Sequence, residues 1–506
     1  ALFYTKELKI SPKELAEKIV TEIEKNKLEE IAKIEVAGIG FINFYLSKEF
    51  FVESVKKVIE TGENYGKNKV LNNQKTIIEY TDPNPFKEFH IGHLMSNAIG
   101  ESIARLYEVN GAKVIRVNYQ GDVGLHVAKA VWGLQQGKQL WEAYAYGNQR
   151  YDDDRYDQDS HTIEEIDAIN KKLYDRSDPE INKRYDEGRK VSLEYFEKQY
   201  ERLGTKFVHY FFESEMGPKG HEIVRQHPEV FEKSDGAVVF KGEEYGLHTR
   251  VFVNSAGLPT YEAKELGLNQ EKFKLYNPDI SIIVTGNEIV AYFNVLLKVT
   301  ALVLPDVASK TRHIPHGMMR LKSGKMSSRT GEVITADELI EQVKEKVGGK
   351  EEVAIGAIKY SILKQSIGHD IIFDFDKSLS VQGDSGVYLQ YTFARLQSIL
   401  SKSDSEDTKG KTNFEELIEK EELDLIKHLI EFPDAVEEAS SQLAPHRVAL
   451  FLYELANKTN CFYEQIHILT DENIPRKSAR LLLIKIVADI LKRGLSLLGI
   501  EVLNKI

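Results

Sequence analysis

The sequence predicts an α/β protein in three parts: a small α+β domain at 1–70, a parallel-sheet domain at 71–335 and an all-α bundle at 336–506. The length of 506 residues suggests several domains. From residue 74 onward, strand-like and helix-like segments alternate, which is typical of a parallel sheet covered by helices. From about residue 350 onward, strand signals almost disappear.

The N-terminal part is predicted to contain a helix, two strands and a second helix. Residues 11–26 begin with a Ser cap and a proline and place apolar residues at helical spacing. Residues 33–46 alternate and are broken by glycines, which indicates strands, and residues 48–62 return to a helical pattern. We therefore expect a small separate unit that ends near residue 70.

The middle part carries the strand–turn–helix repeats. Residues 139–203 interrupt them with a charged, tyrosine-rich segment, which we expect to be an inserted helical hairpin. Ligands of a parallel sheet bind at the carboxyl ends of its strands, so residues that follow the strands are site candidates. The predicted strands lie at 74–81, 112–122, 205–214, 236–240, 249–255, 278–288 and 309–317.

Composition excludes several classes of protein. The net charge of −12 disfavours a protein that coats nucleic acid indiscriminately, although Lys310 to Arg329 holds six basic residues and no acid. The single cysteine, Cys461, excludes an internal disulfide and any zinc site with two Cys ligands. The low cysteine content suits the reducing cytoplasm, where we expect the protein. The chain has no long uncharged apolar run, which predicts that no segment spans a membrane, and its start lacks the pattern of a signal peptide.

Two histidines, His90 and His93, bracket Gly92 at the start of a predicted helix. Free backbone N–H groups and the helix dipole favour anions there, and a glycine lets a flat ring or a phosphate approach. Pro83 and Pro85 stiffen the turn that leads into the helix. The group suits a triphosphate attacked at its α-phosphate. The alternatives are a capping and a packed histidine, or a metal site that lacks a clear third ligand.

A second motif is the basic loop from Leu321 to Gly331, "LKSGKMSSRTG". In it, Lys325 with Ser327 and Ser328 could close over a pyrophosphate leaving group. A doubly wound sheet can bring this loop and the histidine pair to one crevice. The alternative is a solvated basic surface.

The pair H-I-G-H and K-M-S-S-R resembles the signature of class I aminoacyl-tRNA synthetases, whose catalytic domain is Rossmann-like. The stretches "EYTDPNPFKEFHIGHL", "NYQGDVGLHVAK" and "DSGVYLQYTFARLQSIL" are similar to arginyl-tRNA synthetase, and the resemblance covers nearly the whole chain. It implies that L-arginine reacts with ATP, carrying Mg²⁺ on its triphosphate, to give arginyl-adenylate. The arginine then passes to the 3′ end of tRNA(Arg).

The resemblance also implies roles for residues of the two motifs. His90 and His93 match the histidines that stabilise the α- and β-phosphates, and Gly92 matches the glycine beside adenine and ribose. Lys325 and Ser327 would contact the triphosphate.

The lysine loop departs from the K-M-S-K-S pattern, because Ser328 replaces the second lysine and Arg329 the last serine. Family members with such a loop resemble this chain in carrying a lysine just before the histidine pair. Here that residue is Lys87, and we expect it to share the triphosphate with Lys325. The alternative for Lys87 is an exposed turn lysine.

For arginine, the resemblance implies that Glu79 lies near the α-amino group and that Asn84 contacts the bound amino acid. Tyr261 and Glu265, at i and i+4 on one helix, could hold the guanidinium group. The family usually has Asp where Glu265 stands, and a solvated helix pair is the alternative. Two lesser pocket candidates are Asp82 and Asn287.

The resemblance implies that the two terminal domains contact tRNA. The N-terminal domain would contact the outer corner of the tRNA, and the helical C-terminal domain would contact the anticodon. Aromatic side chains and arginine can stack on unpaired bases, although such residues at helical spacing often belong to a core. The candidates are Tyr388, Tyr391, Arg395, Asn460 and Tyr463.

Other readings remain open at this stage. One is another class I synthetase, such as a lysine-specific enzyme; cysteine- or methionine-specific enzymes commonly need a zinc pocket that one cysteine cannot build. Others are a nucleotidylyltransferase with the same histidine signature, and a catalytically silent tRNA-binding paralogue. We expect a monomer without zinc or any other bound metal beyond the Mg²⁺ of the nucleotide.

Overall fold

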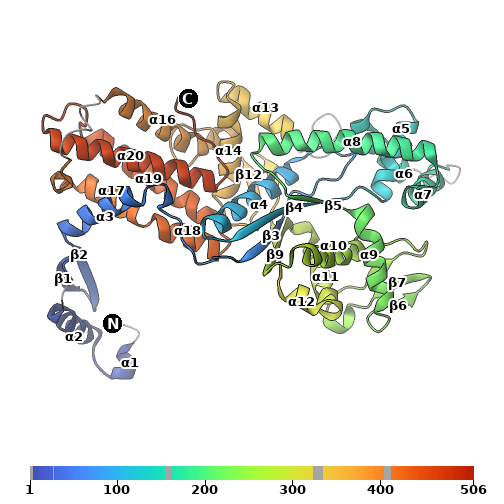
Figure 1. Ribbon diagram of the computed structural model, residues 1–506, viewed down its shortest axis with the longest axis horizontal. Helices are drawn as coiled ribbons and strands as arrows, with labels where there is room; N and C mark the ends of the chain where they lie inside the picture. Colours follow the sequence, from blue (N-terminus) through green and yellow to red (C-terminus); the bar gives the residue numbers. More distant parts are fainter. Residues whose placement is uncertain (1–3, 27, 154–160, 323–333, 404–411, 506) are drawn as a thin grey trace.

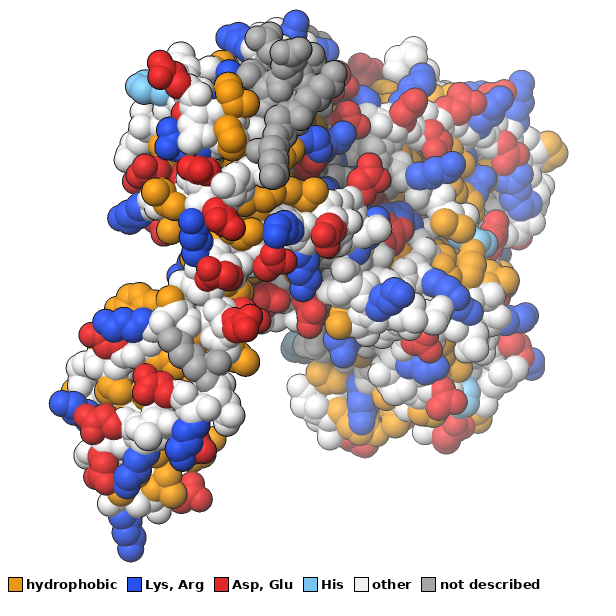
Figure 2. Space-filling view, turned by 60° about the vertical axis from the view of Figure 1, so that its left-hand side comes forward, with side chains coloured by type: hydrophobic (Ala, Val, Ile, Leu, Met, Phe, Trp, Pro, Cys, Tyr) orange, Lys and Arg blue, Asp and Glu red, His pale blue; other side chains and the backbone are white. Residues whose placement is uncertain are grey.

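The computed structural model describes residues 4–26, 28–153, 161–322, 334–403 and 412–505. Figure 1 shows an elongated molecule, with the C-terminal helices at one end, the sheet in the middle and the inserted helices at the other end. None of the helices within these ranges is both long and apolar enough to cross a membrane. Lys, Arg, Asp and Glu side chains alternate over the face seen in Figure 2, and no single sign of charge covers it.

The N-terminal part contains a helix, an antiparallel strand pair and a second long helix, in the predicted order. The Ser11 side chain caps the first long helix by accepting a hydrogen bond from the N–H of Glu14 at 3.1 Å. The hairpin stands away from the body, whereas the second long helix lies against the C-terminal helices (Figure 1). The elements are α1 (Thr5–Leu8), α2 (Pro12–Lys25), β1 (Ile31–Ala37), β2 (Phe41–Leu46) and α3 (Lys48–Thr61).

The middle part is built on a five-stranded parallel sheet in the order β10-β9-β3-β4-β5. The predicted parallel sheet is therefore confirmed. Its strands are β3 (Lys75–Glu79), β4 (Lys113–Gln120), β5 (His209–Phe212), β9 (Ile280–Gly286) and β10 (Thr311–His316). A separate antiparallel sheet holds β6 (Glu232–Ser234), β7 (Ala237–Phe240) and β8 (Arg250–Val253).

Helices cover the parallel sheet. Three of them begin within a few residues of the carboxyl end of a strand, so their N-terminal turns lie at the same edge of the sheet as the strand ends. The helices are α4 (Ile91–Val109), α5 (Leu125–Gln135), α9 (Glu213–Gln226), α10 (Tyr261–Tyr276), α11 (Val290–Val303) and α12 (Pro305–Ser309).

The inserted segment holds three helices, α6 (Leu140–Asp153), α7 (Thr162–Asp175) and α8 (Pro179–Arg202), where we expected a hairpin. The chain breaks between α7 and α8 because Arg176 is left-handed, with a φ of 54°. Asp178 then caps α8 by accepting from the N–H of Ile181, ahead of Pro179 in the first turn.

The C-terminal part is a helical bundle, as predicted. The structure adds the strand β12 (Ile371–Phe373), which pairs with β11 (Met319–Leu321). This strand was not predicted, because three residues are too few to show an alternating pattern. One continuous hydrophobic core joins this bundle to α4 and the sheet. The helices are α13 (Ala336–Lys346), α14 (Glu351–Leu363), α15 (Phe375–Ser378), α16 (Gly386–Lys402), α17 (Lys420–Ile430), α18 (Phe432–Ser441), α19 (His446–Gln465) and α20 (Ile474–Leu497).

Candidate active site

The strand order reverses between β3 and β9. The chain passes from β3 to β4 on one side and reaches β9, on the other side, only later. A cavity of about 500 Å³ opens at the carboxyl ends of these strands. Its walls are the turn after β3, the first turn of α4, the end of β9 and residues 316–321. Open parallel sheets bind their ligands at such a reversal.

The turn after β3 has a strained backbone. Thr81, Asp82 and Phe86 have φ angles of 82°, 45° and 69°, a region that side chains disfavour. Neighbouring polar groups hold the turn: Ser96 Oγ accepts from the N–H of Thr81 at 3.0 Å, and Asp82 Oδ1 accepts from the N–H of Tyr119 at 2.8 Å. A strained turn fixed by its surroundings is typical of a functional site.

The two histidines cap α4 reciprocally. His90 Nδ1 accepts from the N–H of Gly92 at 3.1 Å, and His93 Nδ1 accepts from the N–H of His90 at 3.2 Å. The two rings stack, with 3.6 Å between their centroids. Because both Nδ1 atoms accept, the proton of each neutral ring belongs on Nε2, which can donate to a ligand. Both residues line the cavity, so capping and ligand binding are compatible here.

Both histidines are neutral at physiological pH. Burial, followed by the charge of Lys87, lowers the pKa of His90 to about 4. Burial and the neighbouring His90 hold the pKa of His93 well below its usual value. Gly92 is needed for this cap, because a Cβ there would lie 2.9 Å from His90 Cε1.

Lys87 lies beside the histidine pair, and its ammonium group is 4.3 Å from the ring centroid of Tyr144 on α6. Lys325 and Ser327, with Ser328 and Arg329, lie outside the described residues. The segment that follows them pairs with the histidine motif, since Ile91 donates its N–H to the carbonyl of Ile334 at 3.2 Å.

Four carboxylates gather on the cavity and behind it: Glu79, Asp82, Glu213 and Glu265. Two of them have a lysine partner: Lys272 Nζ lies 2.7 Å from Glu79 and Lys264 Nζ lies 2.6 Å from Glu213.

Among the described residues, no Lys or Arg forms an ion pair with either of the other two acids, Asp82 and Glu265. Burial and the negative charge of Glu79 raise the pKa of Glu265 to about 8. The same two causes hold the pKa of Asp82 well above its usual range. Within the described part of the chain, Glu265 Oε1 and the hydroxyl of Tyr119 are buried without a hydrogen-bond partner. The group therefore has room for a ligand that carries positive charge and can form hydrogen bonds.

The structure brings together most of the residues that are predicted to bind the substrate arginine. Asp82 and Asn84 line the cavity, and Glu79 and Glu265 lie behind it within one group of charges. Tyr261 and Glu265 lie one turn apart on α10 but differ in exposure: Tyr261 is 53% exposed, with its hydroxyl 3.4 Å from His126 Nδ1, whereas Glu265 is buried. Asn287 is exposed and does not line the cavity, although its neighbours Gly286 and Glu288 do.

Glu213 is a further candidate site residue, which the sequence pattern did not single out. It follows β5 directly, just as Asp82 closely follows β3, but the predicted strand ran on to residue 214. A Cβ at Gly121 would lie 2.3 Å from Asn84 Oδ1 and 3.1 Å from Glu213 Oε1, so these oxygens flank the same glycine. An acid directly after a strand of a parallel sheet was the signal available.

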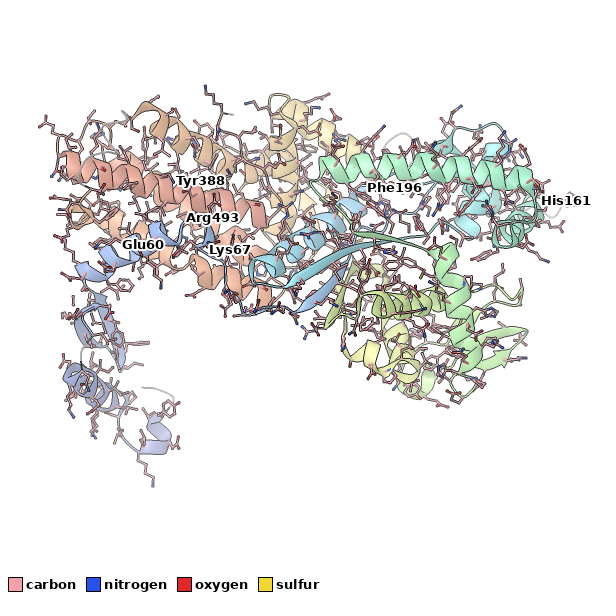
Figure 3. All side chains as sticks on the ribbon, viewed as in Figure 1. Glu60, Lys67, His161, Phe196, Tyr388 and Arg493 are labelled. Carbon is pink, nitrogen blue, oxygen red and sulfur yellow. The ribbon has the colours of Figure 1, made fainter. Side chains whose placement is uncertain are left out.

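The predicted tRNA-contacting residues differ in exposure. Tyr388 lies inside the bundle (Figure 3), and its hydroxyl donates to Asn457 Oδ1 at 2.9 Å and accepts from Asn460 Nδ2 at 2.7 Å. Tyr391 is 46% exposed. The guanidinium of Arg395 stacks on Tyr463, 4.3 Å from its ring centroid. Tyr391 is therefore open to a base, whereas Tyr388 is engaged within the bundle.

Comparison with protein families gives three consecutive matches. Residues 54–375 match "tRNA synthetases class I (R), catalytic domain". Residues 1–46 match "Arginyl tRNA synthetase N terminal domain", and residues 389–506 match "DALR anticodon binding domain".

Full-length relatives agree with these matches. The arginine–tRNA ligase of Clostridium acetobutylicum is 31% identical, over 99% of this chain and 92% of its own. That of Clostridium perfringens is 32% identical, over 97% and 90%. Among solved structures, arginyl-tRNA synthetase of Plasmodium falciparum superposes with a TM-score of 0.79 at 23% identity, covering 99% of this chain and 90% of that one. The arginyl-tRNA synthetase of Thermus thermophilus superposes with a TM-score of 0.73 at 23% identity, covering 100% of this chain and 93% of that one.

Proposed function

This chain belongs to the arginyl-tRNA synthetase family and is an arginine–tRNA ligase, and we propose that it activates arginine in the cavity between the ends of β3 and β9. Membership of the family implies ATP, L-arginine and tRNA(Arg) as substrates. The proposal concerns which residues act on each of them.

The balance of charge carries the arginine assignment. Four carboxyl groups share two lysines, so Asp82 and Glu265 have no lysine partner within this group, and their pKa values are raised until a cationic ligand favours their ionised forms. Arginine brings two cationic groups, an α-ammonium and a guanidinium. We assign the α-ammonium to Asp82 and Asn84 at the cavity, with Glu79 behind them.

The guanidinium would lie deeper, against Glu265 and Glu213. Its planar fork of donors suits carboxylate oxygens, and the unpartnered Glu265 Oε1 can accept from it. Tyr261 would cover the entrance from the rim of the pocket. Glu265, one methylene longer than the Asp usual in the family, would reach the guanidinium from within the charge group around Glu79.

ATP would lie over the first turn of α4. The Nε2–H groups of His90 and His93 would donate to its phosphates, and as neutral donors they do not repel each other. Lys87 with Lys325 and Ser327 would hold the triphosphate, and Gly92 would lie beside adenine and ribose. Mg²⁺ would enter as part of the nucleotide substrate.

In the first step, a carboxylate oxygen of arginine attacks the α-phosphorus. The bond from this phosphorus to the bridging oxygen breaks, and pyrophosphate leaves with the electron pair. No base is needed, because the attacking carboxylate is already ionised. In the second step, a hydroxyl of the terminal ribose of tRNA attacks the arginyl carbonyl carbon, the bond from this carbon to the phosphate oxygen breaks, and AMP leaves with the electron pair while its phosphate takes up the hydroxyl proton.

The outer parts would bind tRNA, with the hairpin of the N-terminal part at its outer corner and the bundle at the anticodon. Tyr391 is the most accessible of the predicted stacking residues, and the Arg395–Tyr463 stack could open to take a base. We further propose that the protein acts as a monomer in the cytoplasm.

Exchange of pyrophosphate into ATP, driven by each amino acid in turn with and without tRNA, tests the proposal. We expect exchange with arginine alone and only when tRNA is present. Exchange with arginine in the absence of tRNA would keep the site and remove the dependence on tRNA. Exchange driven by lysine would contradict the assignment of the acidic group.

A further inference from the structure

The inserted helices contact the turn that carries Lys87. The Lys87 ammonium group lies over the ring of Tyr144, 4.3 Å from its centroid. Within the described ranges, no carboxylate lies within 4.0 Å of this ammonium group. An aromatic face attracts a cation without neutralising it, so the charge of Lys87 stays available to an anion.

That charge acts on the two histidines that line the cavity. It lowers the pKa of His90 and His93, in both cases after the larger effect of burial. Lys87 is half-buried, and its backbone N–H donates to the carbonyl of Asn84 at 3.2 Å. The ring of Tyr144 therefore holds a positive charge next to the two histidine donors.

Close helix packing fixes Tyr144. Helices α5 and α6 touch through small residues: a Cβ at Gly133 would lie 2.2 Å from the carbonyl oxygen of Ala143, and one at Gly147 would lie 2.1 Å from that of Lys129. Ala143 is fully buried and directly precedes Tyr144. This contact fixes the backbone from which the Tyr144 side chain reaches Lys87.

The neighbouring residue, Phe86, is held by α8. The backbone N–H of Phe86, whose conformation is strained, donates to Ser192 Oγ at 2.9 Å. A Cβ at Gly188 would lie 2.3 Å from the Phe86 ring. The same helix continues to Phe196 (Figure 3), which packs against Phe89, one residue before the histidine pair. The insertion thus holds the turn through both α6 and α8.

We propose that Tyr144 is a positioning residue for amino-acid activation, whose ring holds the ammonium group of Lys87 toward the phosphates of ATP. This inference rests on the proposed function, because it assumes that Lys87 contacts the triphosphate. It assigns to the inserted helices a part in catalysis that neither signature motif carries.

The test is arginine-driven ATP–pyrophosphate exchange by the full chain, with tRNA present. We expect Tyr144→Leu to lose about 3- to 30-fold in kcat/KM for ATP, with the KM for arginine unchanged. Tyr144→Phe, which keeps the ring, should restore activity. Tyr146→Leu is the matched control, because Tyr146 lies on the same helix under another lysine, with Lys138 Nζ at 4.6 Å and Trp132 stacked on it.

A double-mutant cycle with Lys87→Met separates positioning from a structural role. If Tyr144 acts through Lys87, adding Tyr144→Leu to Lys87→Met should cost nothing further. An equal loss in both backgrounds, or an equal loss from Tyr146→Leu, would overturn the proposal. Unchanged exchange in Lys87→Met would also overturn it, while the arginine ligase activity of the unaltered chain would still stand. Lysine-driven exchange by the unaltered chain would instead be a failure of the proposed function.

Discussion

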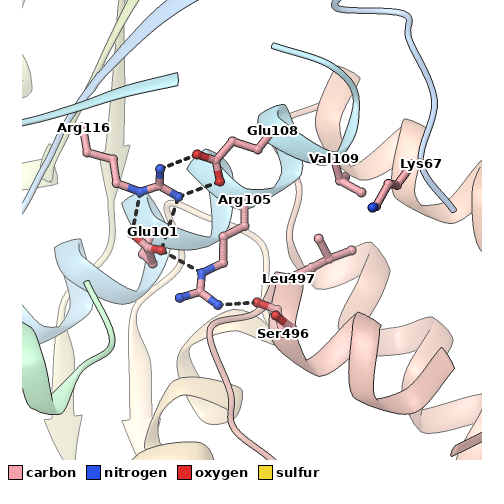
Figure 4. A pocket seen from close by; sticks show the side chains of 8 residues that line it. All are labelled: Lys67, Glu101, Arg105, Glu108, Val109, Arg116, Ser496 and Leu497. Carbon is pink, nitrogen blue, oxygen red and sulfur yellow. Dashed lines mark hydrogen bonds and ion pairs between the residues drawn. The ribbon is translucent and has the colours of Figure 1, made fainter. Parts of the chain in front are cut away.

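Two buried glutamates, Glu101 on α4 and Glu265 on α10, differ in the partners that the chain supplies. Glu101 is 3% exposed and accepts from Arg105 Nε at 2.7 Å, Arg116 Nε at 3.0 Å and the hydroxyl of Tyr80 at 2.6 Å. Figure 4 shows the two arginines converging on it. Glu265 is 5% exposed, and one of its oxygens has no partner among the described residues.

The pKa of the two carboxyl groups moves in opposite directions. Burial alone would raise the pKa of Glu101, but Arg116 and Arg105 lower it below its usual value. Burial and a neighbouring carboxylate raise that of Glu265 to about 8. A buried carboxylate with its cations in the chain supports the fold, whereas one without them is ready for a cationic ligand.

The partners of Glu101 also connect domains. Tyr80 directly follows β3, and Arg105 Nη1 donates to the carbonyl of Ser496 at the end of α20 at 2.9 Å (Figure 4). Arg105 Nη2 donates to the carbonyl of Gly204, just after α8, at 3.0 Å. The Glu101 group therefore ties the sheet to the bundle and to the insertion.

Replacing Glu265 by Gln should have the largest effect on activity. We expect kcat/KM for arginine to fall about 100- to 1,000-fold, because the guanidinium would lose a charged acceptor in a buried site. Thermal stability without arginine should barely change at pH 7, since a carboxyl group with a pKa of about 8 is mostly neutral there. Exchange kinetics and thermal unfolding measure the two effects.

The matched control is Glu262→Gln, a buried acid on the same helix whose partner is in the chain, with Arg250 Nη1 at 3.5 Å. It should leave the KM for arginine unchanged. Equal losses in the two variants would mean that the missing partner does not distinguish Glu265.

Replacing Glu101 by Gln should lower the stability of the fold and leave the binding of arginine intact. Gln keeps one acceptor oxygen but loses the charge, so two partly buried guanidinium groups lose their carboxylate partner, and we expect the unfolding free energy to fall by about 3 kcal/mol. The KM for arginine of the folded enzyme should stay near its original value. Glu108→Gln, which removes a half-exposed acid that also pairs with Arg116, should cost less than about 1 kcal/mol. A Glu101→Gln protein of unchanged stability would contradict the comparison.

The sequence predicted those parts of the site that lie next to each other in the chain. The histidine pair was singled out because it follows one clear strand and begins one clear helix, whereas Glu79, Asp82 and Asn84 were predicted from the resemblance to arginyl-tRNA synthetase. Glu213 was missed because the end of β5 was placed two residues too late, which hid an acid at a strand end. Boundary errors of this size are usual when strands are short.

Other features could not be predicted, because they join distant segments. Nothing in the α10 sequence shows that Lys272 is fully buried against Glu79, 193 residues away. The contact of Tyr144 with Lys87 depends on how closely α5 and α6 pack. The glycines of these helices allow close packing, but their presence in the sequence does not predict it. The fold class was predictable from periodicity, whereas the balance of charge needed the structure.

The smallest expected effect is a dependence of arginine affinity on pH. The ionised form of Glu265 binds the guanidinium, so below pH 8 arginine must displace a proton from this carboxyl group. The KM for arginine should therefore rise as the pH falls, by about 20-fold from pH 8.5 to 6.5 for a single group with this pKa. The raised pKa of Asp82 acts in the same direction and would steepen the change. Exchange kinetics across this range, with Glu265→Gln as the control that loses most of the dependence, measure it. A KM that stays constant in the unaltered chain would mean that arginine does not meet an unpaired carboxylate, and the contrast between Glu101 and Glu265 would then concern the fold alone.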